Sequence, residues 1–383
     1  MTEPQEPPVR TSLSELARVF LRLGTVSFGG PAVHVALMEE EIVRRRRWLT
    51  RDAFLDLLGA ANLIPGPNST ELAVHVGYAR AGWPSLLVAG ACFIVPAALI
   101  VAAVAWGYVR FGSLPAITGI LAGVKPVVIA IVVQAIWNLG RGVLSSRRAI
   151  ALGVACVVAV ALGVHELAVL AAAGAVMWIA VTWRSSAADR PRASGVVALS
   201  ALVVAPAAPA AFSVGGLFLV FLKIGSVLFG SGYVLLAFLR ADLVVRLGWL
   251  TERQLLDAVA VGQVTPGPVF TTATFVGYLL GGPSGAVIAT IGIFLPAFVF
   301  VAASGPLLPM VRRSAGARAV LDGVNIASLA LMAVVTMQLA RAALAGPIGI
   351  VLAVASAIAL VRLKLSAAWL VLAGALVGVL LLR

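Results

Sequence analysis

Long apolar runs, separated by short clusters of arginine, make up most of this chain. A transmembrane helix needs about 20 predominantly apolar residues to cross the hydrocarbon core of a bilayer, and several runs reach or approach that length. In the first half of the chain, spans are predicted near residues 84–109, 116–139, 148–164 and 166–183. The pattern therefore predicts an all-α polytopic membrane protein.

The segment before these spans predicts shorter, interrupted helices. Residues 14–23 have helical spacing, with Ser14 as the N-cap. The motif FGGP at 28–31 breaks this helix, and a second helical piece follows it as far as a basic loop at 44–47.

Two further apolar pieces lie on either side of the motif Pro65-Gly66-Pro67. Residues 52–64 and 68–80 would each form a helix about 20 Å long at 1.5 Å per residue, too short for a core about 30 Å thick. Proline and glycine prevent one helix from running through the motif. The segment is therefore predicted to be a re-entrant helical hairpin.

The second half of the chain repeats the first. A shift of 201 positions aligns residues 21–67 with 222–268 without a gap, and 17 of these 47 positions are identical. Composition alone would give about five matches. The predicted organisation is a polar tail at 1–12, a first repeat at 13–183, a polar linker at 184–194 and a second repeat at 195–383.

The number of spans in each repeat decides how the two repeats are oriented. Five crossings plus one hairpin is an odd number of crossings, so the second repeat is predicted to be inverted in the membrane. This arrangement puts 17 cations on the inner side and 8 on the outer side, as the positive-inside rule favours. A break repeated in both halves of such a protein indicates a substrate site between them.

Composition agrees with the membrane assignment. The 383 residues are 61% hydrophobic and 11% charged, and their mean hydropathy is +1.08. The net charge of +13 is ascribed to cytoplasmic arginine-rich loops and not to nucleic-acid binding. The two cysteines and three histidines have no disulfide or metal-site spacing, so no metal or cofactor is predicted. No signal peptide is apparent.

Polar residues that directly follow each break are the first candidates for chemistry. Asn68, Ser69 and Thr70 follow the first Pro-Gly-Pro, and Thr271 and Thr272 follow the second. These residue types are typical N-caps, and a helix start attracts anions. An alternative is that they only cap the helices.

Ionisable residues inside apolar segments are the second group. Arg22 aligns with Lys223, and two cations related by the repeat would neutralise a dianion, although both side chains are also long enough to reach the headgroups. Lys125 has Asn325 at its repeat position and is a coupling residue, a selectivity residue or an interfacial anchor. The other coupling candidates are Asp56, Asp257, Glu71 and His75, with His34 considered beside them; pairing of the two aspartates with neighbouring arginines, and ordinary packing of the others, are the alternatives.

An enzyme is not predicted, because the chain has no nucleophile elbow, zinc-protease motif or Walker loop. The motifs FGGP at 28–31, WL at 48–49 and PGPN at 65–68 resemble those of the chromate ion transporter family. FGSG at 229–232 and QVTPGP at 263–268 resemble its C-terminal domain. The resemblance covers the whole chain as two fused family domains, the long-chain form.

This resemblance implies a multi-pass plasma-membrane protein that exports chromate by secondary active transport and confers chromate resistance. Sulfate or another tetrahedral oxyanion, a channel, and a non-transporting sensor or scaffold remain alternatives. The partners are the oxyanion and the lipid bilayer, with a homodimer left open. The predicted substrate-binding residues are Arg22, Gly29, Gly30, Pro65, Gly66, Pro67, Asn68, Ser69 and Thr70 in the first half, and Lys223, Gly230, Ser231, Gly232, Pro266, Gly267, Pro268, Thr271 and Thr272 in the second.

Overall fold

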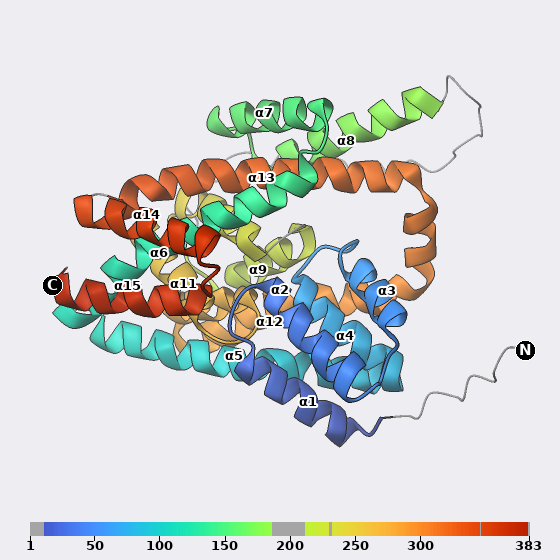
Figure 1. Ribbon diagram of the computed structural model, residues 1–383, viewed down its shortest axis with the longest axis horizontal. Coiled ribbons are helices and arrows are strands. Elements are labelled where there is room, and N and C mark those ends of the chain that lie inside the picture. The colour runs from blue at the N-terminus through green and yellow to red at the C-terminus, as the bar shows by residue number, and fades with distance from the viewer. Residues whose placement is uncertain (1–10, 113, 186–210, 230–231, 345, 382–383) are drawn as a thin grey trace, which may run out of the picture.

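The computed structural model describes residues 11–112, 114–185, 211–229, 232–344 and 346–381, and this part of the chain is all-helical (Figure 1). The elements of the first half are α1 (Leu13–Val26), α2 (Pro31–Met38), η1 (Glu39–Arg45), α3 (Arg51–Ala61), α4 (Asn68–Ala81), α5 (Trp83–Phe111), α6 (Pro115–Val143), α7 (Arg147–Ala161) and α8 (Glu166–Ser185). Most of the predicted tail and linker lies outside the described residues.

The second half has the same order of elements. They are α9 (Val214–Val227), η2 (Gly232–Val234), α10 (Leu235–Leu239), η3 (Arg240–Arg246), α11 (Glu252–Val264), η4 (Val269–Thr271), α12 (Thr272–Arg313), α13 (Ala315–Ala343), α14 (Pro347–Arg362) and α15 (Ala367–Leu381). The label α12 covers two helices that meet at Gly281 and Gly282, whose backbones are not helical. Gly82 separates α4 from α5 at the matching place in the first half.

Two local predictions in the N-terminal segment are wrong. The N-cap of α1 is Ser12 and not Ser14, because the Ser12 side chain accepts a hydrogen bond from the Glu15 N–H. The predicted basic loop begins inside η1, a π-helix, which takes in Arg44 and Arg45. A second π-helix, η3, lies 201 positions later, at the corresponding place in the other half.

Five helices in the described residues are long and apolar enough to cross a membrane. They are residues 83–111, 115–143, 166–183, 269–304 and 315–341. The predicted span at 148–164 is not among them, because α7 has 15 residues and extends only about 22 Å.

The last helices of each half pack against the other half. In the first half, α7 and α8 pack on α13 of the second half, while α14 and α15 pack on α6 (Figure 1). Counterpart helices of the two halves also touch, α5 against α12 and α6 against α13. The packing is therefore reciprocal.

Glycines bring the backbones together at these crossings. A Cβ on Gly123 of α6 would collide with the Gly374 carbonyl oxygen of α15, and a Cβ on Gly323 of α13 would collide with the Ala173 carbonyl oxygen of α8. Small residues allow this close approach between membrane helices.

Gly123→Ala is expected to lower the thermal unfolding midpoint of the purified protein in detergent. The added methyl group has no room beside Gly374, and overpacking of this kind costs about 1–3 kcal/mol. Gly107→Ala in α5 is the matched control, because nothing lies within 4 Å of its Cβ position. An equal midpoint for the two variants would contradict the crossing.

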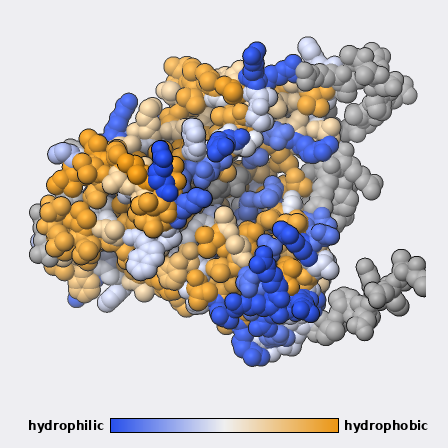
Figure 2. All heavy atoms as spheres, in the orientation of Figure 1, coloured by the Kyte–Doolittle hydropathy of each residue, from blue (hydrophilic) through white to orange (hydrophobic). Residues whose placement is uncertain are grey.

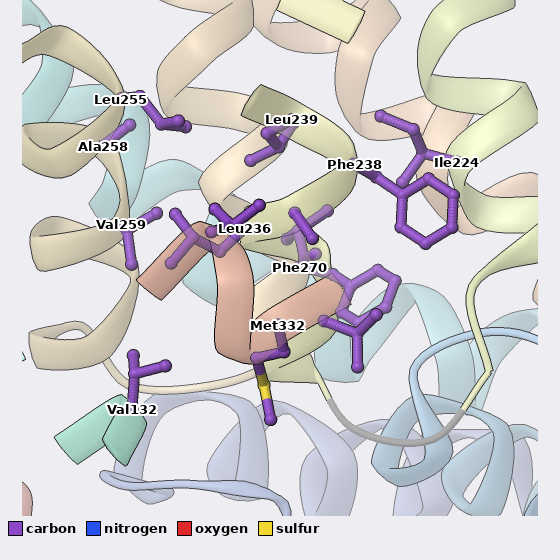
Figure 3. Packing of buried hydrophobic residues seen from close by; sticks show 14 of the residues in the cluster. Val132, Ile224, Leu236, Phe238, Leu239, Leu255, Ala258, Val259, Phe270 and Met332 are labelled. Carbon is purple, nitrogen blue, oxygen red and sulfur yellow. The ribbon is translucent and has the colours of Figure 1, made fainter. Parts of the chain in front are cut away.

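The buried core is centred on the second half. Figure 3 shows side chains of α11 facing those of α10, with Phe270 of η4, Val132 of α6 and Met332 of α13 around them. Exposed apolar side chains cover much of the outer surface, while hydrophilic side chains gather at the end formed by the N-terminal helices (Figure 2). This surface suits a protein surrounded by lipid.

Candidate functional site

The two Pro-Gly-Pro loops each bond to the opposite half of the chain. The Gly66 N–H donates to the Leu228 carbonyl oxygen over 2.8 Å, and the Gly267 N–H donates to the Ser27 carbonyl oxygen over 2.9 Å. Leu228 and Ser27 follow the ends of α9 and α1, at matching positions of the two halves. Each helix break is therefore held by the helix end of the other half.

Only glycine fits at the centre of these loops. Gly66 has φ +136° and Gly267 has φ +86°, in the region that favours glycine. A Cβ on Gly66 would collide with the Glu71 carboxylate, and one on Gly267 would collide with Ala97 of α5. Residues Pro65, Pro67, Pro266 and Pro268 flank these contacts.

The residues after the first break do not cap α4 as predicted. The helix begins at Asn68, and its N-cap is Pro67, which makes no side-chain capping bond. Asn68 instead donates to the Asn62 side chain over 2.6 Å. The Thr70 and Glu71 N–H groups donate to the Pro67 carbonyl oxygen over 2.7 and 3.0 Å. The N–H groups of Asn68 and Ser69 precede them and have no acceptor in the described residues, and a helix start carries a partial positive charge.

The first turn of α4 carries buried polar atoms that lack partners in the described residues. Ser69 Oγ contacts His34 Nδ1 of α2 over 3.2 Å. Thr70 Oγ1 and both carboxylate oxygens of Glu71 have no hydrogen-bond partner there, and both residues are 0% exposed. Ser27 Oγ and His34 Nε2 are in the same condition, and the His34 ring lies beside the backbone of Ser27 and Gly29.

Leaving such groups without partners is costly, about 1–3 kcal/mol for each neutral group. A cluster of five such atoms around one loop therefore points to an unrecorded ligand or to a changing conformation. Because the residues are buried, a ligand reaches them only after neighbouring elements move.

The second break does not share this polarity. Four polar residues of the first half are replaced by apolar ones at the repeat positions: Ser27 by Leu228, His34 by Leu235, Asn68 by Val269 and Ser69 by Phe270. Thr271 and Thr272 are buried, but their hydroxyls donate to the carbonyl oxygens of Pro268 and Val269, both over 2.8 Å. The candidate site is thus asymmetric, with its unpartnered polar atoms in the first half.

Arg22 and Lys223 do not meet at a common site. Lys223 Nζ lies 2.6 Å from Asp242 Oδ1 and 3.5 Å from Glu166 Oε1, so its charge is already neutralised. Arg22 is exposed and lines a surface hollow with Glu15, Arg18, Glu41 and Arg46. The prediction that the two cations neutralise one dianion does not fit these contacts.

Lys125 and Asp257 form a buried ion pair between the halves. Lys125 Nζ of α6 lies 2.9 Å from Asp257 Oδ1 of α11, and the Tyr108 hydroxyl of α5 donates to Asp257 Oδ2 over 2.8 Å. Asp257 is 0% exposed and the Lys125 side chain 13%. Lys125 is therefore not an interfacial anchor, and Asp257 pairs with a lysine rather than with an arginine. Asp56, at the matching repeat position, is exposed.

The remaining predicted residues lie around the loops. Gly30 faces the Tyr233 hydroxyl of the other half, which would be 3.0 Å from an added Cβ. His75 is buried in α4, one turn beyond Glu71. Gly232 begins η2, while Gly230 and Ser231 lie outside the described residues.

Sequence reasoning missed Ser27, Tyr108 and Asp242 as members of these clusters. Ser27 directly precedes the FGGP motif, and that position was a usable signal. Asp242 aligns with Glu41, so the repeat itself marked an acid there. Tyr108 carried no signal, because only the packing of α5 against the second half brings it to Asp257.

Comparison with known proteins gives a consistent result across the chain. The sequence profile of the family described as chromate transporter matches residues 14–178 and again residues 215–379. A chromate transport protein of Pseudomonas aeruginosa is 33% identical over 351 residues, which cover 89% of this chain and 83% of that protein. A chromate transport protein of Cupriavidus metallidurans is 32% identical over 376 residues, or 96% and 92%. No solved structure matches the chain.

Proposed function

Because the chain belongs to the chromate transporter family, we propose that it is a secondary active transporter that exports chromate across the plasma membrane and so confers chromate resistance. The observation that carries the proposal is the cluster of buried, unpartnered polar atoms beside the first Pro-Gly-Pro loop. The oxyanion binds there, at the start of α4, between the two crossed loops.

The chemistry of the cluster suits a tetrahedral oxyanion. The start of α4 supplies the N–H groups of Asn68 and Ser69 and a positive dipole end, and the Thr70 and Ser27 hydroxyls supply further donors. These groups bind an anion without a permanent counter-charge, so the site can also release it. Sulfate and molybdate have the same shape, and competition among the three ions decides the preferred substrate.

Transport requires the buried cluster to open alternately to the two sides of the membrane. The reciprocal hydrogen bonds of Gly66 and Gly267 support a symmetric exchange, in which each loop separates from the helix end of the other half. We propose that the two repeats are inverted, with α3–α4 and α11–η4 as re-entrant hairpins. In that arrangement, opening one side and closing the other are equivalent motions.

Thr70→Val is expected to reduce oxyanion transport strongly, whereas Thr271→Val spares it. Thr70 Oγ1 has no partner in the described residues, while Thr271 Oγ1 is already bonded to Pro268. Losing a donor to a charged ligand costs about 1.5–3 kcal/mol, or roughly 10- to 100-fold in affinity. Both variants are compared with the unmodified protein in proteoliposomes, with labelled chromate, an imposed gradient, and sulfate or molybdate as competitors.

Equal effects of the two substitutions would contradict the placement of the site in the first half. Absence of saturable uptake of all three ions by the unmodified protein would defeat the transporter proposal and favour a sensor or scaffold. Flux that does not saturate and needs no coupling ion would favour a channel.

A further inference from the structure

A hollow of about 320 Å³ opens on the surface between α1 and the π-helix η1. Its polar lining comes from Ser12, Glu15, Arg18, Arg22, Glu41 and Arg46. It lies at the hydrophilic end of the molecule (Figure 2). The site proposed above, by contrast, is buried beside the first Pro-Gly-Pro loop.

The hollow has more positive than negative charge available for a ligand. Arg46 lies 2.6 Å from Glu15 and 2.8 Å from Glu41, so both carboxylates already have a cationic partner. Arg18 and Arg22 have no carboxylate partner in the described residues; the Arg18 Nε reaches only the Ser14 carbonyl oxygen of its own helix, at 3.4 Å. These two guanidinium groups lie one turn apart on the same helix, the spacing at which side chains are neighbours.

The corresponding place in the second half is closed by its own ion pairs. Lys223 and Asp242 stand at the repeat positions of Arg22 and Glu41, and they bond over 2.6 Å. Arg246 approaches Asp242 over 2.8 Å. Leu219 stands in place of Arg18. Because Lys223 also lies 3.5 Å from Glu166, each of these second-half cations has a carboxylate partner. In the described residues of the first half, by contrast, Arg18 and Arg22 have none.

We propose that this hollow is a second anion site, which binds a phosphate-like tetrahedral oxyanion group between Arg18 and Arg22. Arginine pairs match such groups because each guanidinium presents two parallel N–H donors to two oxygens. The group is either a free oxyanion or the phosphate of an anionic lipid, since both present the same oxygens. The inference stands on the hollow alone and does not depend on the proposed transport activity.

The test measures binding to the purified full chain at constant ionic strength. One arm titrates sulfate and inorganic phosphate into delipidated protein in detergent and follows the thermal unfolding midpoint. The other arm reconstitutes the chain in nanodiscs of phosphatidylcholine with or without phosphatidylglycerol and counts retained anionic lipid by mass spectrometry. Arg18→Gln/Arg22→Gln is the test variant, and Arg110→Gln, an exposed arginine at the end of α5, is the control.

Arg18→Gln/Arg22→Gln is expected to bind the oxyanion or the anionic lipid at least about tenfold more weakly in one arm, while Arg110→Gln binds it as tightly as the unmodified protein. Loss in the detergent arm assigns a free oxyanion, and loss in the nanodisc arm assigns a lipid phosphate. Arg18→Lys/Arg22→Lys keeps the charge but not the paired donors. Its affinity is expected to lie between those of the unmodified protein and Arg18→Gln/Arg22→Gln. Repeating the titration in the Thr70→Val background separates this hollow from the buried site. Binding that is unchanged by the double substitution in both arms overturns the proposal.

Discussion

Glu71→Gln is expected to preserve oxyanion transport while abolishing its dependence on pH. Both carboxylate oxygens of Glu71 are buried without a partner in the described residues, directly under Gly66. An ionised carboxylate in that position would be costly and would repel a dianion. We therefore expect the resting side chain to be the neutral acid, able to donate a hydrogen bond to the proposed oxyanion, and glutamine keeps such a donor.

The measurement is initial-rate uptake of sulfate into proteoliposomes from about pH 6 to about pH 9, a range in which sulfate remains a dianion. The unmodified protein is expected to slow as pH rises, because the carboxyl group loses its proton and its donor. Glu71→Gln stays flat over the same range, and Glu71→Leu, which has no donor, is slow throughout. A glutamine variant that is as slow as the leucine variant would show that Glu71 must release its proton during transport.

Lys125→Ala is expected to destabilise the protein by about 3–5 kcal/mol, because it leaves the Asp257 carboxylate buried without its cation. Asp257 is 0% exposed, and Tyr108 is its second partner. Lys125→Leu/Asp257→Asn removes both charges and keeps an acceptor for Tyr108, so it recovers most of the loss. Thermal unfolding in detergent gives the comparison.

The exposed pair formed by Arg45 and Glu40, whose side chains are 58% and 41% exposed, provides the control. Its disruption by Arg45→Ala costs about 0–1 kcal/mol, as is usual for surface pairs. A double variant at Lys125 and Asp257 as unstable as the single variant would mean that the positions matter for packing and not for charge. If the double variant folds but no longer transports, the pair couples the movement of α6 to that of α11.

Several parts of this organisation were predictable from sequence because they depend on local rules. Proline and glycine at 65–67 and 266–268 end the preceding helices wherever they are placed. Long apolar runs give α5, α6 and α8 within a few residues of the predicted bounds. A family resemblance carried by short motifs was equally visible and is confirmed by the comparisons.

What sequence reasoning missed depends on contacts between distant residues. Lys125 and Asp257 are 132 positions apart in the numbering, and neither repeat position predicts the pair, since Asn325 and the exposed Asp56 stand there. The prediction that Asn68, Ser69 or Thr70 caps α4 was wrong for a different reason. Pro67 already supplies the extended backbone that precedes α4, so the polar residues after it are free of the capping role. That freedom is what leaves Thr70 available for a ligand.

The reciprocal packing of the last helices also fixes the order in which the protein can be completed during synthesis. The ribosome releases α6, α7 and α8 long before α13, α14 and α15 exist. The face of α6 that carries Gly123 therefore contacts lipid until its partner helix has been made. Gly123 meets Gly374 only when α15 has been inserted. Contacts of such high sequence separation form late and leave apolar surfaces open to wrong partners in the meantime. A substitution that prevents α15 from packing would therefore first affect the opposite half, because α6 would remain unpacked and accessible to quality-control proteases.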